Sequence, residues 1–346
     1  MATLTATRVP TVAIPRATVR RDWVVILASL WMGAGLYWDG WAHGYGLPDS
    51  FWTIWHAAFY SGFVVTALAI LTPTVLAHRR GVSWRAAIPA GYEAATLGVF
   101  IFAFAGIFDM TWHTVFGIEL STDALLSPSH MALGTGALLM VSGPFAAAAR
   151  RPTRSGLLAQ LPAVISLSFI LGTFTFFTLF AGPYSGVIGS GPRPADSVLV
   201  RSLLGVYVFS ALVVGCALVG IRERLLPPGA LTVLIGFNGF GMILMRGHAP
   251  WEVQILFMVV AIVAGALGDL LLWRLGPSMD DVLRIRLFAF LLPALYWALY
   301  LEETALRIGS GWTVHELTGI VVQAGIDGLL DSYVFIGRNA KQTARP

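Results

Sequence analysis

Long apolar segments recur along the whole chain, separated by short stretches rich in glycine, proline and charged residues. A membrane-spanning helix needs about 20 mostly apolar residues at a rise of ~1.5 Å per residue. By this measure we expect ten spans, and the fold class is therefore all-α, a polytopic transmembrane bundle arranged as helical hairpins. The predicted spans are 23–44, 51–77, 87–116, 124–149, 157–181, 198–220, 229–247, 251–273, 283–306 and 313–336.

The composition agrees with a membrane protein and excludes an ordinary soluble domain. Hydrophobic residues make up 57% of the chain and charged residues only 12%, whereas soluble domains carry about 25% charge. The single cysteine, Cys216, lies within an apolar segment, so neither a disulfide framework nor a thiolate metal site is expected. The net charge of +4 comes from Lys and Arg residues that lie mostly on one side of the predicted bundle, so no nucleic-acid partner is expected.

Positive charge is distributed unevenly between the two sides of the predicted bundle. With ten spans, the two tails and every second loop hold all of the 22 Lys and Arg except Arg193, Arg201, Arg246 and Arg307. Lys and Arg mark the cytoplasmic side of a membrane protein. We therefore expect a plasma (inner) membrane protein with cytoplasmic tails at 1–22 and 338–346, flanking a transmembrane domain at 23–337.

The histidines gather on the opposite, extracytoplasmic side. His78 lies in a cytoplasmic loop, but the other six fall near the outer ends of predicted spans. Ionisable groups within a membrane are costly and mark functional sites by default. The six are His43, His56, His113, His130, His248 and His315.

The first predicted hairpin, 23–77, places acidic and imidazole groups on one helix face. Asp39 and His43 are four residues apart, so their side chains project from the same face of a helix. His56 opens the next span. One carboxylate and two imidazoles are therefore predicted to meet at the outer end of this hairpin.

The second hairpin, 87–149, repeats the pattern 70 residues later. Asp109 and His113 have the same spacing of four, in D-M-T-W-H against D-G-W-A-H in the first hairpin, and His130 opens the fourth span. A third, altered copy occurs at 283–336, where Glu302 takes the place of the first histidine and His315 follows 13 residues later. We predict metal ligands in all three hairpins.

Such groups of ligands suit a catalytic metal site. Three protein ligands leave open positions for water, dioxygen or substrate, and mixed nitrogen and oxygen ligation suits copper(II), iron, manganese or zinc. The alternative interpretation is a buried hydrogen-bonded network that caps the helix ends. If the three hairpins converge, a two-metal centre becomes possible.

Residues 100–140 also carry a resemblance to a known family. The segment D-M-T-W-H-T-V-F-G-I-E-L-S-T-D-A-L-L-S-P-S-H at 109–130 resembles the metal-binding segment of the C subunit of particulate methane and ammonia monooxygenases. The resemblance implies copper, held by Asp109, His113 and His130. The connection between the second and third ligands is four residues longer here, and ten spans exceed the six or seven of that subunit.

These features favour a metal-dependent membrane oxidoreductase, monooxygenase-like, that uses copper (or iron or zinc) on a small or apolar substrate. Expected partners are the lipid bilayer and either membrane partner subunits or further copies of the chain. A metal transporter, a metal-insertion or assembly protein, and a haem-binding electron carrier remain as alternatives. The sequence names neither the metal, its nuclearity nor the substrate.

Overall fold

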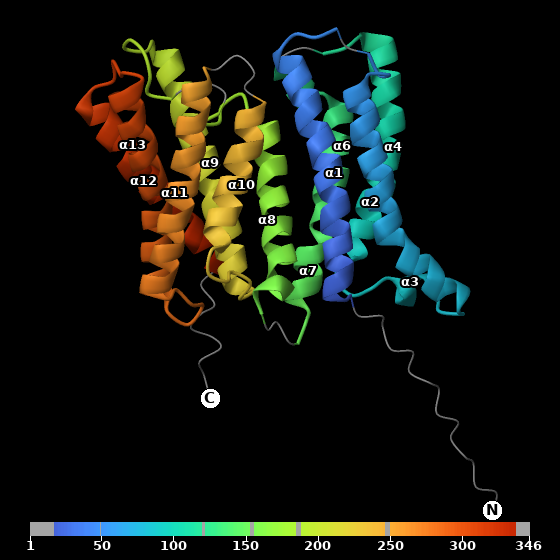
Figure 1. Cartoon of the computed structure of the whole chain (residues 1–346). Coiled ribbons are helices and arrows are strands. Elements are labelled where there is room, and N and C mark those ends of the chain that lie inside the picture. Colours follow the sequence, from blue (N-terminus) through green and yellow to red (C-terminus); the bar gives the residue numbers. More distant parts are fainter. Residues whose placement is uncertain are drawn as a thin grey trace, which may run out of the picture.

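The computed structural model describes residues 17–48, 50–119, 122–152, 156–184, 188–245 and 250–336. Over these ranges the named secondary-structure elements are all helices, and an isolated bridge joins Gly191 and Ser310. The helices stand side by side in one bundle (Figure 1). They are α1 (Val19–Gly44), α2 (Ile54–Arg79), α3 (Trp84–Ala87), α4 (Glu93–Phe116), α5 (Thr122–Leu126), α6 (Pro128–Val141), α7 (Gly143–Ala149), α8 (Leu157–Phe177), α9 (Asp196–Arg222), α10 (Ala230–Leu244), α11 (Trp251–Leu275), α12 (Val282–Arg307) and α13 (Val314–Ile336).

The expected transmembrane helical bundle is confirmed. Eight segments of the described chain are long and apolar enough to cross a membrane: α2, α4, α6 with α7, α8, α9, α11, α12 and α13. The apolar α10 has 15 residues, and α1 has 26 residues but a mixed composition. Each of the ten predicted spans therefore has a helix, and the chain is an integral membrane protein.

Helix α1 begins before the predicted first span, which starts at residue 23. Its first residue is Val19, within the predicted tail, and its N-cap Thr18 accepts a hydrogen bond from the backbone of Arg21 at 3.3 Å. Asp22 is fully buried, where it accepts hydrogen bonds from the Tyr92 hydroxyl at 2.8 Å and from Arg151. These partners lie 70 residues or more away in the sequence, so no local pattern indicates them.

The predicted span 124–149 is interrupted. Short helix α5 precedes α6, and α6 ends at Val141 before α7 restarts at Gly143. Pro144 lies in the first turn of α7, where its missing N–H costs nothing but prevents a continuous helical ladder from α6. The Ser166 hydroxyl of α8 donates to the Val141 carbonyl at 2.5 Å and so satisfies the end of α6.

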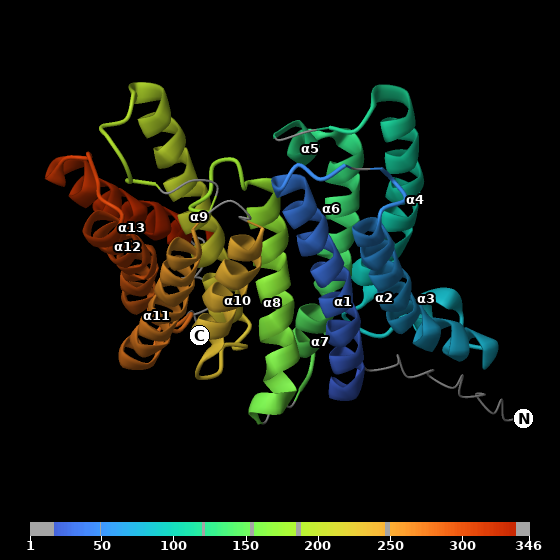
Figure 2. The same cartoon turned by 45° about the horizontal axis from the view of Figure 1, so that its top comes forward.

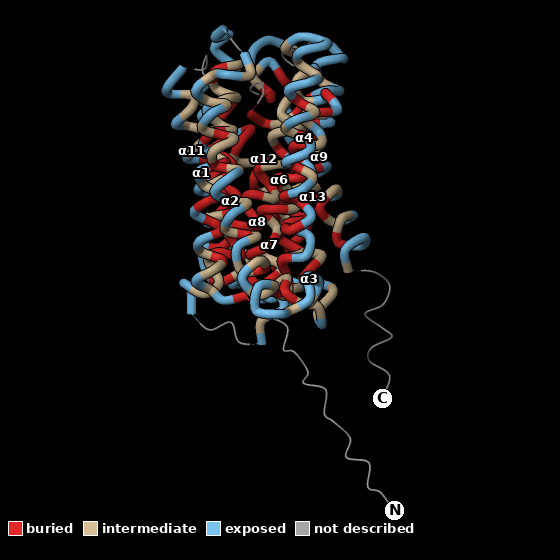
Figure 3. The backbone as a smooth tube through the Cα atoms, turned by 90° about the vertical axis from the view of Figure 1, so that its right-hand side faces the viewer, coloured by how far each residue is buried: buried red, intermediate tan, exposed pale blue. Residues whose placement is uncertain are grey.

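The bundle has two hydrophobic cores that meet along α8. One core is formed by α1, α2, α4, α6 and α7, and the other by α9 to α13; α8 contributes Phe169 to the first and Leu171 to the second. Both views place α8 between the two groups of helices (Figures 1 and 2). Buried residues follow the inner faces of the helices, while the outer faces are exposed (Figure 3).

The exposed outer faces are apolar. Phe104 and Ile107 of α4 are 70% and 64% exposed, and Val259 and Ile262 of α11 are 49% and 45% exposed. Exposing a large contiguous apolar surface of this kind to water is unfavourable. It is the surface expected of helices that face lipid.

Candidate metal centres

The first hairpin brings its three predicted ligands together. Asp39 and His43 lie in the last two turns of α1, and His56 lies in the first turn of α2. Asp39 Oδ1 is 3.5 Å from His43 Nε2 and 3.2 Å from His56 Nε2. We call these three residues the first centre.

The second hairpin forms the same arrangement. Asp109 Oδ1 is 3.4 Å from His113 Nε2, both on α4, and 3.2 Å from His130 Nε2 in the first turn of α6. Ser127 is the N-cap of α6, and its hydroxyl accepts from the backbone N–H of His130 at 3.3 Å. The S-P-S-H segment therefore starts the helix at the point that directs His130 toward α4. We call Asp109, His113 and His130 the second centre.

In each centre the three ligand atoms lie within 4.8 Å of one another. Over the residues that the structure describes, these are the only groups of three such side chains that could hold a metal ion. The predictions that Asp/His/His ligands meet within the first and second hairpins are thus supported by the geometry.

The third hairpin contributes to neither centre. Glu302 and His315 are exposed, and α12 and α13 lie at the opposite end of the bundle from α2 and α4 (Figures 1 and 2). The neighbouring acids have structural partners: Glu303 pairs with Arg307 at 3.4 Å. Glu316 accepts from the backbone N–H of Thr313 at 2.6 Å, which caps α13. The condition for a shared two-metal centre, convergence of all three hairpins, is therefore not met among the described residues. His248 falls outside the described residues.

Backbone carbonyls fix the protonation of the imidazoles. Nδ1 of His56 is 2.9 Å from the Ser50 carbonyl, and Nδ1 of His130 is 2.6 Å from the Ala124 carbonyl. A carbonyl oxygen only accepts, so in each ring Nδ1 carries a hydrogen. Nε2 is the atom that faces the aspartate in both centres.

In each centre a carboxylate oxygen and two imidazole nitrogens therefore lie within reach of one shared cation. Oδ1 of Asp39 and Oδ1 of Asp109 are both buried and accept no hydrogen bond. A buried anionic oxygen without a partner is strongly destabilising. A cation between the oxygen and the two Nε2 atoms removes that penalty, so the residues fit a bound metal ion.

Two further side chains belong to the second centre. The Tyr60 hydroxyl of α2 donates to Asp109 Oδ2 at 3.2 Å. Glu119 Oε2 lies 3.0 Å from His113 Nδ1, whose ring also faces the Gly117 carbonyl at 3.3 Å. Contacts of this kind orient a ligand and raise its basicity.

Sequence reasoning missed both residues. Tyr60 carries no signal, because it reaches Asp109 across 49 residues of sequence. Glu119 does carry one: it follows His113 by six residues, as Asp49 follows His43 by six in the first hairpin. Asp49 itself lies outside the described residues.

Comparisons with family models, curated proteins and solved structures gave no match to this chain.

Proposed function

We propose that this protein is a copper-dependent membrane oxidoreductase that holds one metal ion in each Asp/His/His centre. The observation that carries the metal assignment is the convergence of two imidazole Nε2 atoms on one buried carboxylate oxygen, with the three ligand atoms within 4.8 Å of one another, found twice in related hairpins.

The ligand set favours copper, with iron or zinc as alternatives. Each centre offers two imidazole nitrogens and one carboxylate oxygen, and affinity for such a set is highest for copper(II) among the divalent first-row metals. Thiolate ligation is absent because Cys216 is buried in the core formed by α9 to α13. The resemblance of 109–130 to the C subunit of the copper membrane monooxygenases supports the same metal.

The chain's own residues have clear tasks in such an enzyme. Three protein ligands leave open coordination positions, and a bound copper ion would supply one-electron chemistry with dioxygen there. Asp39 and Asp109 offset part of the metal charge, and the carbonyls behind His56 and His130 fix the ring orientation. The positive-inside distribution supports an extracytoplasmic location for both centres.

The geometry disfavours a haem carrier. A haem held by two histidines needs its porphyrin plane between their Nε2 atoms. In the second centre the rings of His113 and His130 have centroids 5.2 Å apart, and both Nε2 atoms approach the same oxygen of Asp109. A carboxylate therefore occupies the space that a porphyrin would need.

Metal content tests the proposal. The protein would be purified from cells supplied with copper, iron and zinc, and metals per chain measured by mass spectrometry for the wild type, His43→Ala and His113→Ala. We expect two equivalents of copper in the wild type and one in each variant. His78→Ala is the matched control, because His78 stacks on Trp84 away from both centres. Metal-free protein, or copper content unchanged in both ligand variants, would refute the assignment.

A transporter would give a different result. It would bind metal but deliver it across a vesicle membrane, so copper would appear inside proteoliposomes. An oxidoreductase would retain its copper and change its electron paramagnetic resonance (EPR) signal on reduction.

A further inference from the structure

The two centres open onto one cavity. A space of about 780 Å³ lies among α1, α2, α4, α6 and α8 and reaches the ends of α10 and α11. Five of the six ligands line it: Asp39, His43, His56, Asp109 and His130. The volume lies within the range of about 300–1,000 Å³ that small-molecule sites occupy. It is far larger than water or dioxygen requires.

Tyr60 shows how closely the centres are joined. It lies one turn after His56 on α2, and its hydroxyl reaches Asp109 of the second centre while its ring also lines the cavity. A single side chain thus connects the helix of one centre to the carboxylate of the other. A molecule in the cavity can therefore meet both centres.

Among the described residues, the remaining wall is mostly apolar and carries no charge. It includes Leu133 of α6, Phe177 of α8 and Val253 of α11, and no described Lys or Arg lines it. Away from the two centres, a charged group on the ligand would therefore meet no partner on the described wall, and burying an unpaired charge is costly.

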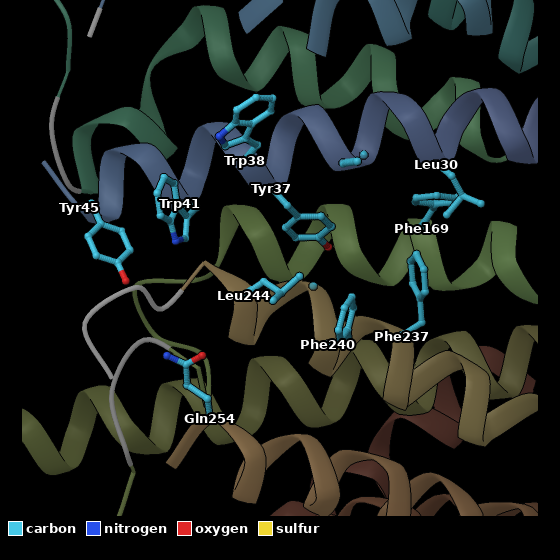
Figure 4. A pocket seen from close by; sticks show the side chains of 13 residues that line it. Leu30, Tyr37, Trp38, Trp41, Tyr45, Phe169, Phe237, Phe240, Leu244 and Gln254 are labelled. Atoms are coloured by element: carbon cyan, nitrogen blue, oxygen red, sulfur yellow. The ribbon is translucent and has the colours of Figure 1, made fainter. Parts of the chain in front are cut away.

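A second pocket shows that apolar lining alone does not define this site. A space of about 450 Å³ on another face of α1 is lined by Tyr37, Trp41, Phe169 and Phe240, with Gln254 as its amide side chain (Figure 4). Among the described residues, no histidine or acid lines it. Of these two cavities, the larger one combines an apolar wall with candidate metal ligands.

We propose that both centres act on one ligand, an uncharged and largely apolar molecule whose single polar or reacting atom faces the metals. Its hydrocarbon body lies against Leu133 and the phenylalanines of α8. The inference rests on the proposed function, because the metals define which end of the molecule is held. It adds a substrate class: molecules with a chain or ring of several carbons.

Gly134 and Phe177 control the depth of the cavity. A Cβ atom at Gly134 would lie 2.2 Å from the Phe177 ring, so the ring occupies its position only because residue 134 has no side chain. Phe177→Ala would therefore lengthen the space available to the ligand. Leu133→Trp would fill it from the α6 side.

The test uses 1-alkylimidazoles from methyl to octyl as probes, with one metal-binding nitrogen and a variable apolar chain. Copper-loaded protein in nanodiscs is titrated at pH 8, at free probe concentrations fixed by dialysis, and both copper EPR signals are followed. We expect one probe per chain to change both signals, because its nitrogen binds one copper while its chain displaces solvent at the other. Affinity should rise about fourfold per added methylene until the cavity is full. An imidazole with a carboxylate at the far end of its chain should bind at least tenfold more weakly.

Three variants make the result specific to the cavity. Phe177→Ala should raise the chain length of tightest binding, and Leu133→Trp should lower it. Met131→Trp, on the same helix but 47% exposed toward lipid, is the matched control and should leave the series unchanged. If Leu133→Trp does not fold, Phe177→Ala alone still shows whether a deeper cavity raises the chain length of tightest binding.

The outcomes separate this inference from the proposed function. Absence of copper would refute the metal centres themselves. Three results would refute the shared apolar ligand in a protein that holds two equivalents of copper. They are two probes bound per chain, a change in only one copper signal, and a probe affinity that depends neither on chain length nor on Phe177→Ala. Each of them would leave the two metal centres supported.

Discussion

The two centres share one ligand pattern but differ in what surrounds it. In the first, side-chain exposure is 16% for Asp39 and 29% for His43, against 6% for Asp109 and 8% for His113 in the second. The third ligands reverse this order, with 12% for His56 and 26% for His130. In the second centre the Tyr60 hydroxyl donates to Asp109 and the Glu119 carboxylate lies beside His113. The aspartates of the duplicated motif therefore lie in two different environments.

The difference has an energetic consequence. Burial strengthens the attraction between a carboxylate and a cation, and an additional carboxylate behind an imidazole increases its donation to the metal. We expect the second centre to bind a divalent ion more tightly than the first and to stabilise the more oxidised state. The first centre is then the more readily exchanged one.

The largest expected effect comes from removing either aspartate. Asp109→Ala should empty the second centre and Asp39→Ala the first, each lowering bound copper from two equivalents to one, because two neutral imidazoles do not balance the metal charge. Mass spectrometry of metal per chain measures both. Asp123→Ala, an exposed acid of α5, is the control and should retain two. Loss of both ions in either variant would mean that the centres are not separate.

Removing the carboxylate behind His113 should have the next largest effect. Glu119→Gln keeps the shape but removes the charge, and we expect copper affinity to fall about 10- to 100-fold at the second centre only. Competition with a chelator of known affinity gives the value. Glu302→Gln, an exposed acid of the third hairpin, should change neither affinity. An equal fall at both centres would contradict the comparison.

A smaller loss is expected from the bridging tyrosine. Tyr60→Phe removes one hydrogen bond to an ionised carboxylate, which is worth about 1.5 kcal/mol, or roughly tenfold in affinity, at the second centre. Tyr207→Phe removes a comparable hydroxyl, bonded to Gln323 at 2.8 Å far from both centres, and serves as control. No change in Tyr60→Phe would show that Asp109 is oriented without it.

The smallest expected effect is a difference in the pH at which the two centres release their metal. Protons compete for Nε2, so metal is retained at high pH and released as the pH falls through the range where imidazole protonates. If the second centre binds ten times more tightly and two protons displace each metal, its release midpoint lies about half a pH unit lower. Copper EPR during an acid titration would resolve two steps. Release of the second centre first would reverse the comparison.

The sequence predicted much of this arrangement because the relevant signals are local. Apolar segments of sufficient length located a helix for each predicted span. A spacing of four residues fixed Asp39 with His43, and Asp109 with His113, on single helix faces. Placing the third ligand needed only the hairpin, because the end of one helix adjoins the start of the next.

The same reasoning failed where a residue's partner is distant in sequence. The predicted cytoplasmic tail runs to residue 22, yet Asp22 is buried and accepts hydrogen bonds from Tyr92 and Arg151. The third hairpin repeats the spacing of the first, but its exposed Glu302 and His315 join neither group of ligands. Spacing along a helix reports which face a side chain occupies, and not what that face meets.

The sequence by itself determined a membrane-embedded helical bundle and two Asp/His/His groups, since hydrophobic length and i, i+4 periodicity act within one or two helices. Only the tertiary structure decided that Tyr60 joins the second centre, that Glu119 stands behind His113, and that both centres open onto one cavity bounded by α8. These features depend on how separate hairpins pack. That packing is set by side-chain contacts across long sequence separations, which no local pattern encodes.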